Sequence, residues 1–230
     1  MKLTPPQIDQ LYTFTRQHYV EYFDLQTELV DHLANSIEEQ WAENPKQSFE
    51  EALQMEFKKF GIFGFMDVVE QRKKAMNKKY SKLVWLHFKS FFRLPQILGT
   101  LLSILLVFQL LKSITISHEV VAILTFMILI SFWVGLIRMN RKRKKTVKEE
   151  GKKWLLKDII YGYSSLAGMS YLPFQIFLQF EIHHSNLITL FFMSFFMVSM
   201  VIIEYIMFFV IPSKASEYLK QTYPEYELAW

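Results

Sequence analysis

The chain has 230 residues, of which 51% are apolar, 17% aromatic and 21% charged, and its formal net charge is +4. This apolar and aromatic composition excludes intrinsic disorder, and seven glycines and seven prolines are too few for a turn-rich β-protein. Because the chain has no cysteine, disulfides, thiolate catalysis and thiolate metal sites are excluded. We therefore expect an all-α fold.

Residues 1–77 are expected to form a small helical bundle, because their composition is that of a soluble domain and their net charge is −5. Thr4, followed by Pro5 and Gln7, predicts the start of a first helix that runs to about residue 18. Apolar residues at helical spacing predict a second helix over 21–41.

Ser48 and Glu51 have the spacing of a capping box, which predicts the start of a third helix. Gly61 is expected to end this helix, and a fourth helix is expected from about residue 65. The amino terminus lacks the apolar run and cleavage site of a secretory signal peptide. We therefore expect the domain 1–77 to stay in the cytoplasm.

An acidic ridge is expected along one face of the second helix, opposite its broad apolar face. Carboxylates recur there at helical spacing, and the residues considered for docking are Asp24, Glu28, Asp31 and Glu38. Such a ridge can bind a basic partner or the protein's own basic segment, because opposite charges steer association. A solvated helix face is the alternative interpretation.

Three stretches carry a family resemblance: YFDLQTELVDHL at 22–33, SFEEAL at 48–53 and KFG at 59–61. Together they resemble the bacterial HTH-associated alpha-helical signalling (HAAS) domain, over residues 5–77. The resemblance implies a small cytoplasmic bundle placed before membrane helices and linked to PadR-type regulators. It also implies a signalling or regulatory role and no enzymatic one. The whole chain resembles Bacteroidetes-type membrane proteins.

Residues 78–93 form a basic and aromatic connector without any acidic residue. This pattern is typical of a helix that lies against an anionic inner leaflet. The side chains expected to face lipid are those of Lys78, Lys79, Lys82, Trp85, Lys89 and Arg93. Nucleic acid is the rival partner, but an apolar span follows directly, so lipid already explains the pattern and we expect no nucleic-acid partner.

Four apolar stretches within residues 94–211 are near or above the length of about 18 residues that indicates a membrane span. They are residues 94–111, 120–137, 159–180 and 187–211. Their short connections predict two helical hairpins, and thus a four-helix transmembrane bundle. Gln109 interrupts the first stretch, for which a buried or re-entrant helix is the alternative.

The orientation follows from the segment 138–158, which we expect to be a basic loop because it holds ten Lys or Arg and three acidic residues. The positive-inside rule places such a loop in the cytoplasm. Both termini are then cytoplasmic, and the membrane is the bacterial inner membrane. The tail 212–230 is expected to dock on the amino-terminal bundle.

Glu204 is the single carboxylate well inside a predicted span. An ionisable group at this depth is a functional candidate for ion or proton movement, and its expected companions are Gln109, Gln175 and Gln179. The alternative is a protonated Glu204 that only fixes helix packing through a hydrogen bond.

The chain carries no phosphate-binding loop, zinc-protease motif or nucleophile elbow. We expect no enzymatic activity, no cofactor and no metal. The predicted function is signalling or regulation through contact with a cytoplasmic protein partner, with the bilayer as the second partner. The alternative is a transporter accessory or small permease-like subunit that uses Glu204, and a homo-oligomer stays open.

Overall fold

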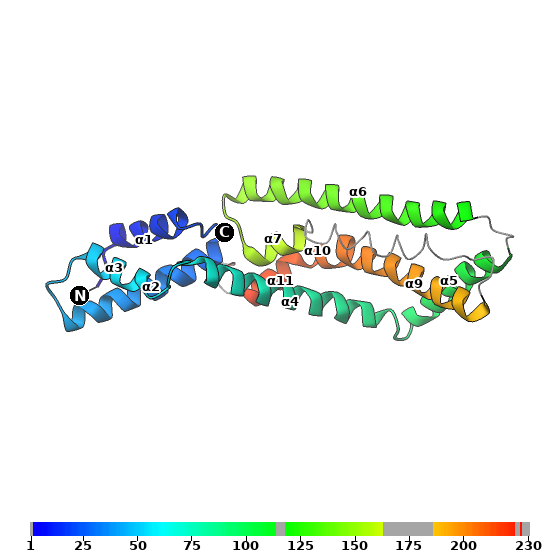
Figure 1. The fold of residues 1–230 in the computed structure, drawn as a ribbon, viewed down its shortest axis with the longest axis horizontal. Helices are drawn as coiled ribbons and strands as arrows, with labels where there is room; N and C mark the ends of the chain where they lie inside the picture. The colour runs from blue at the N-terminus through cyan, green and yellow to red at the C-terminus, as the bar shows by residue number, and fades with distance from the viewer. Residues whose placement is uncertain (1, 114–117, 163–185, 224–225, 227–230) are drawn as a thin grey trace. The chain divides into compact units, whose positions relative to one another are not determined.

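A computed structural model describes residues 2–113, 118–162, 186–223 and 226. Every regular element in these ranges is a helix (Figure 1), which confirms the expected all-α class. The chain divides into two compact units. The first unit comprises Met1–Lys78 and Val147–Asp158, and the second comprises Lys79–Thr146 and Ile159–Trp230.

The first unit begins with three helices that are joined by short connections: α1 (Pro5–Gln17), α2 (Phe23–Glu43) and α3 (Phe49–Lys58). The backbone N–H and hydroxyl of Thr4 both donate to Gln7 Oε1 at the start of α1, and Ser48 and Glu51 cap α3 reciprocally. Both predicted helix starts are therefore confirmed.

Helix α2 provides the centre of the first unit's core and packs against α1 and α3 (Figure 1). Its Leu33 and Ile37 are fully buried, and Trp41 is buried near its end. Helix α1 contributes Leu11 and α3 contributes Ala52, both without solvent exposure. The predicted apolar face of α2 is thus the face that forms the core.

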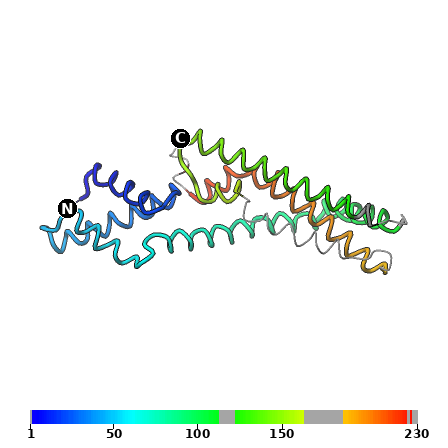
Figure 2. The backbone as a smooth tube through the Cα atoms, turned by 45° about the horizontal axis from the view of Figure 1, so that its top comes forward, coloured from blue at the N-terminus to red at the C-terminus, as the bar shows by residue number. Residues whose placement is uncertain are grey.

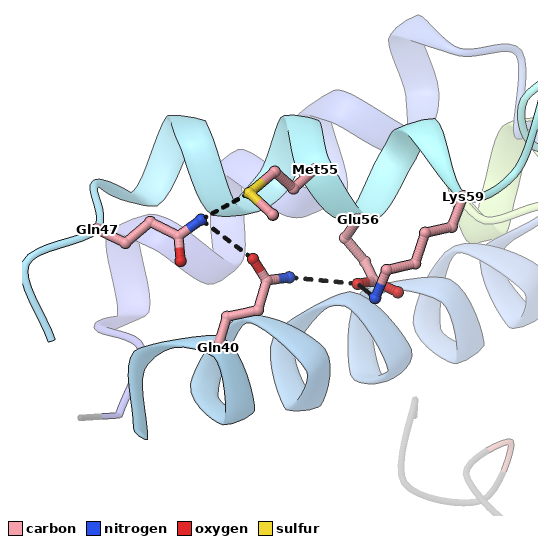
Figure 3. A network of polar contacts seen from close by, with 5 residues as sticks. All are labelled: Gln40, Gln47, Met55, Glu56 and Lys59. Carbon is pink, nitrogen blue, oxygen red and sulfur yellow. Dashed lines mark hydrogen bonds and ion pairs between the residues drawn. The ribbon is translucent and has the colours of Figure 1, made fainter. Parts of the chain in front are cut away.

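Side-chain amides and one buried acid join α2 to α3 (Figure 3). Glu56 Oε2 accepts a hydrogen bond from Gln40 Nε2 at 3.3 Å and pairs with Lys59 Nζ at 2.6 Å. Gln47 Nε2 donates to Gln40 Oε1 at 3.2 Å and reaches Met55 Sδ at 3.1 Å. Because a buried carboxylate is costly without partners, these contacts fix the register between the two helices.

The segment 138–158 differs from the loop that we expected. Helix α6 (His118–Glu150) continues through its basic residues, Gly151 follows with φ +64°, and α7 (Leu155–Tyr161) begins four residues later. Residues 147–158 belong to the first unit, and we call them the docked segment. Helix α4 (Met66–Ser90) likewise includes most of the expected connector 78–93.

The second unit contains the apolar helices. Helix α5 (Gln96–Ser113) packs along α9 (Leu187–Tyr205), as Figures 1 and 2 show, and α9 leads into a π-helix, η3 (Ile206–Val210), and a short α10 (Ile211–Ser213). The stretches Ala122–Glu150 and Leu187–Ser213 are long and apolar enough to cross a membrane, and Gln96–Lys112 is a shorter apolar helix.

The third expected span, 159–180, lies mostly outside the described residues. The tail contains helix α11 (Ala215–Thr222), which belongs to the second unit and contacts α4 there. Tyr218 Oη lies 2.7 Å from His87 Nε2, and Lys79 Nζ donates to Thr222 Oγ1 at 2.7 Å. Helix α11 thus packs on α4 within the second unit, and the docking of the tail on the amino-terminal bundle stays a prediction.

Candidate functional site

The acidic ridge of α2 is largely occupied by contacts within the first unit. Asp24 Oδ1 accepts the backbone N–H of Leu155 at 3.1 Å. Glu28 pairs with Arg72, and Glu38 Oε1 accepts the backbone N–H of Leu3 at 2.9 Å. Asp31 remains exposed. Leu155, which Asp24 contacts, belongs to the basic segment 138–158. This contact therefore corresponds to the alternative in which the ridge binds the protein's own basic segment.

The docked segment is attached to the start of α2 by main-chain and side-chain contacts. The backbone N–H of Phe23 donates to the carbonyl oxygen of Lys153 at 2.8 Å. Tyr22 Oη donates to Asp158 Oδ2 at 3.2 Å, and Lys153 Nζ pairs with Glu21 at 2.6 Å. Two residues of the segment, Lys153 and Asp158, are therefore held at the start of α2.

Trp154 anchors the docked segment in the first unit's core. Its side chain is 1% exposed, and its ring meets that of Phe23 edge-on with 5.4 Å between the centroids. The next residues, Leu155 and Leu156, are also buried, while Lys152 Nζ lies 4.4 Å from the centroid of the Phe23 ring. The core of this unit is thus completed by residues about 130 positions further along the chain than Phe23.

An apolar tip, formed by Ile62, Phe63 and Met66, projects from the turn between α3 and α4. Ile62 is 99% exposed and Phe63 is 69% exposed. Gly61 and Gly64 flank these residues with φ values of +76° and +54°, a region that favours glycine. The backbone therefore turns tightly at both ends and presents two large apolar side chains to the surroundings, as interaction sites do.

Glu204 lies on α9 and meets α6 through Ser131. Ser131 Oγ is 2.5 Å from Glu204 Oε2 and 2.8 Å from the carbonyl oxygen of Ile128. Ser131 Oγ is the donor in both contacts, and because a serine hydroxyl has one hydrogen, the Glu204 carboxylate and the Ile128 carbonyl compete for it. The other oxygen, Oε1, is buried and has no hydrogen-bond partner among the described residues.

Among the described residues, the structure gives Glu204 a partner, Ser131, that was not among its expected companions. Gln109 lies on α5, whereas Gln175 and Gln179 fall outside the described residues. Ser131 was not singled out, because a serine in an apolar helix is an ordinary sequence feature. The signal that could have found it is depth: Ser131 lies six residues, and Glu204 seven residues, before the end of its predicted span, or about 9–10 Å at the helical rise.

The contact between α6 and α9 continues beyond Glu204. At Gly135, a Cβ atom would lie 2.6 Å from Cδ2 and Cε2 of Phe208, so any larger residue requires this ring to move. Phe208 belongs to the π-helix η3, in which the N–H of Ile211 donates to the carbonyl oxygen of Ile206. π-Helices often occur at functional sites, and this one begins two residues after Glu204.

Of the six connector residues expected to face lipid, all but Arg93 lie on α4, and Arg93 follows that helix. Lys89 Nζ lies 5.2 Å from the centroid of the Trp85 ring, and Lys79 contacts the tail. Lys78, Lys82 and Arg93 are exposed. Two of the five cations that were expected to face lipid are thus held by neighbouring side chains.

The contact between His87 and Tyr218 joins α4 to the tail through two partly buried groups. Burial, reinforced by the charge of Lys214, lowers the pKa of His87. Burial, reinforced by Glu217, raises the pKa of Tyr218. Both shifts favour the neutral form of the group concerned.

No protein-family model, curated protein or solved structure matches the chain. The HAAS resemblance of residues 5–77 therefore stays a prediction. Within the described ranges, no three metal-ligating side chains lie together. The features that stand out there are the docked segment, the apolar tip and the pair formed by Ser131 and Glu204.

Proposed function

We propose that the chain is a signalling or regulatory protein of the bacterial inner membrane. In this proposal four spans anchor it, both termini are cytoplasmic, and a HAAS-like cytoplasmic unit acts as a sensor or adaptor through protein contact. Two helices of spanning length support the membrane part, and the basic residues after position 137 support the orientation.

The observation that carries the proposal is the burial of the docked segment. This segment continues directly from α6, whose apolar part is long enough to cross a membrane. Trp154, Leu155 and Leu156 then enter the core of the first unit. A change in the position of α6 would therefore act on the core of the cytoplasmic unit through a continuous chain and a packed tryptophan.

The apolar tip is the surface at which this unit would meet its partner. Ile62 and Phe63 are far more exposed than large apolar side chains in a packed monomer need to be, and Met66, a few residues further along the chain, is also exposed. The charges nearby are mixed, with Lys58 and Lys59 before the tip and Asp67 and Glu70 after it. A partner with an apolar pocket fits this surface better than an anionic membrane does, because the latter selects for clustered cations.

The test is photo-crosslinking in the native host. A photoreactive amino acid at position 62 is expected to capture one specific partner, whereas the same amino acid at Asn35, which is exposed on α2, captures none. The double substitution Ile62→Ser and Phe63→Ser, probed from position 66, should lower the yield about tenfold or more, because truncating interface anchors costs about 2 kcal/mol or more.

Met55→Ser is the matched control, since Met55 is an exposed apolar residue of the same unit. It should leave the crosslink yield unchanged. Point substitutions are preferable to a deletion of residues 1–77, because the deletion would remove the core against which the docked segment packs. Equal capture from positions 62 and 35, or an unchanged yield in the double variant, would reject the tip as the docking surface.

A second candidate function is that of a transporter accessory or small permease-like subunit. It is favoured by Glu204 Oε1, which is buried without a hydrogen-bond partner among the described residues. If this function is correct, Glu204→Gln abolishes proton uptake by liposomes that contain the full chain, measured with an internal pH-sensitive dye. Glu217→Gln, the same chemical change outside the spans, should keep the uptake. Wild-type uptake no faster than that of empty liposomes would rule the function out.

A further inference from the structure

A hollow of about 780 Å³ lies within the second unit between α5, α6 and α9. Its wall is almost entirely apolar. Helix α5 contributes one face of small residues, and the opposite walls come from α6 and α9; the residues used below are Phe91, Pro95, Gly99, Thr100 and Ser103. All of them belong to the same compact unit.

The hollow exists because the side chains on this face of α5 are short. A Cβ atom added at Gly99 would meet no atom within 4 Å, so the space beside it is open. Thr100 Oγ1 donates to carbonyl oxygens of Phe91 and Gln96, and Ser103 Oγ donates to that of Gly99. Because both hydroxyls are satisfied within the chain, the wall offers a ligand an apolar surface.

The dimensions of the hollow suit a hydrocarbon chain. Its lining runs along α5 from Gln96 to Leu110, which corresponds to about 21 Å at the helical rise. Half of a bilayer's hydrocarbon core is about 15 Å thick, so an acyl chain of one leaflet can lie within it along its full length. Water would gain few hydrogen bonds there.

A cation lies in the sequence between two residues that line one end of the hollow. Phe91 and Pro95 both line it, and Arg93 lies between them in the turn before α5, with its side chain exposed. The sequence has no acidic residue from position 71 to position 118, whereas cations recur through this stretch. An anionic headgroup at this end would complement Arg93.

We propose that the hollow is a binding site for an anionic phospholipid, with one acyl chain between α5, α6 and α9 and the phosphate at Arg93. The site rests on the membrane insertion in the proposed function and is independent of the partner contact at the apolar tip. It gives the membrane part a chemically defined ligand.

The test is native mass spectrometry of the detergent-purified full chain, with equal amounts of phosphatidylglycerol and phosphatidylethanolamine added. We expect the wild-type chain to retain one phospholipid and to prefer phosphatidylglycerol. The double substitution Gly99→Leu and Ser103→Leu fills the hollow and should reduce retention to the background level. Leu105→Phe, which enlarges an exposed residue of α5 outside the hollow, should retain the lipid.

Arg93→Gln tests the headgroup contact without altering the hollow. It should reduce the preference for phosphatidylglycerol about fivefold, which corresponds to the loss of one cation near an anionic surface. Lys112→Gln, at the other end of α5, should keep the preference. This surface substitution keeps the proposal testable if the filled variant fails to fold.

Three results would overturn the site: wild-type retention at background, retention of lipid by the folded filled variant at the wild-type level, or an unchanged headgroup preference in Arg93→Gln. Loss of the crosslink at position 62 with normal lipid retention would reject the partner contact alone. Normal crosslinking with no retained lipid would reject the lipid site alone.

Discussion

Replacing Trp154 by alanine is expected to lower the free energy of unfolding of the first unit by about 3–5 kcal/mol, the usual cost of truncating a buried tryptophan. The side chain is 1% exposed and packs against Phe23. Since domains are stable by only about 5–15 kcal/mol, a large share of the stability of this unit depends on one side chain of the docked segment.

The measurement is hydrogen exchange by mass spectrometry on the full chain in detergent. Loss of the tryptophan should remove protection from the docked segment and from the amide of Phe23, whose N–H donates to the carbonyl oxygen of Lys153. Trp133→Ala is the matched control, because Trp133 is 52% exposed on α6. Unchanged protection in Trp154→Ala would show that the docked segment does not hold the unit together.

Gly135→Ala is expected to destabilise the second unit by about 1–3 kcal/mol, the typical cost of overpacking. The added Cβ would lie 2.6 Å from two atoms of the Phe208 ring. Since Phe208 belongs to η3, the ring cannot withdraw without moving this helix or rotating away from α6. The contact between Ser131 and Glu204, one turn earlier on α6, should be lost with it.

Thermal unfolding followed by intrinsic fluorescence provides the measurement. Gly99→Ala is the matched control, because a Cβ there meets nothing within 4 Å. A double variant that combines Gly135→Ala with Phe208→Ala should cost less than the sum of the two single changes, since residues in contact couple by about 0.5–3 kcal/mol. Strict additivity would mean that Gly135 does not serve to admit the ring.

The local elements of the fold could be predicted from the sequence because their signals are local. Thr4 with Gln7 and Ser48 with Glu51 form the expected capping boxes. The helical spacing of Leu33, Ile37 and other apolar residues predicted the face of α2 that is buried. Each of these features depends on residues within a few turns of one another.

The docked segment could not be predicted, because the many basic residues beside it in the sequence concealed its short apolar stretch. Residues 138–158 were interpreted as a loop from ten basic residues, although Trp154, Leu155 and Leu156 form an apolar island after Gly151. That island was the available signal. The residues of α2 that it contacts are about 130 positions away in the sequence. The helical spacing of apolar residues cannot predict a contact between such distant positions.

The candidate sites show the same difference between local features, which the sequence predicts, and tertiary contacts, which it does not. The depth of Glu204 in a span was visible from the sequence, whereas its contact with Ser131 depends on how α6 and α9 pack. The acidic ridge was visible as a pattern, but the contacts of Asp24, Glu28 and Glu38 within the unit depend on tertiary structure. The apolar tip was missed because two apolar residues in a turn have no periodicity.

The composition of the first unit from two separate stretches has a consequence for biosynthesis. After the ribosome has added Lys78, it must add 80 more residues before Asp158 completes the unit. At about 5–20 residues per second this takes about 4–16 s. During this time the apolar surface of α2 is not covered by Trp154, because that residue has not yet been synthesised. A nascent chain therefore exposes this surface to chaperones until the basic end of α6 has been translated, and the order of translation couples completion of the amino-terminal domain to synthesis of α6.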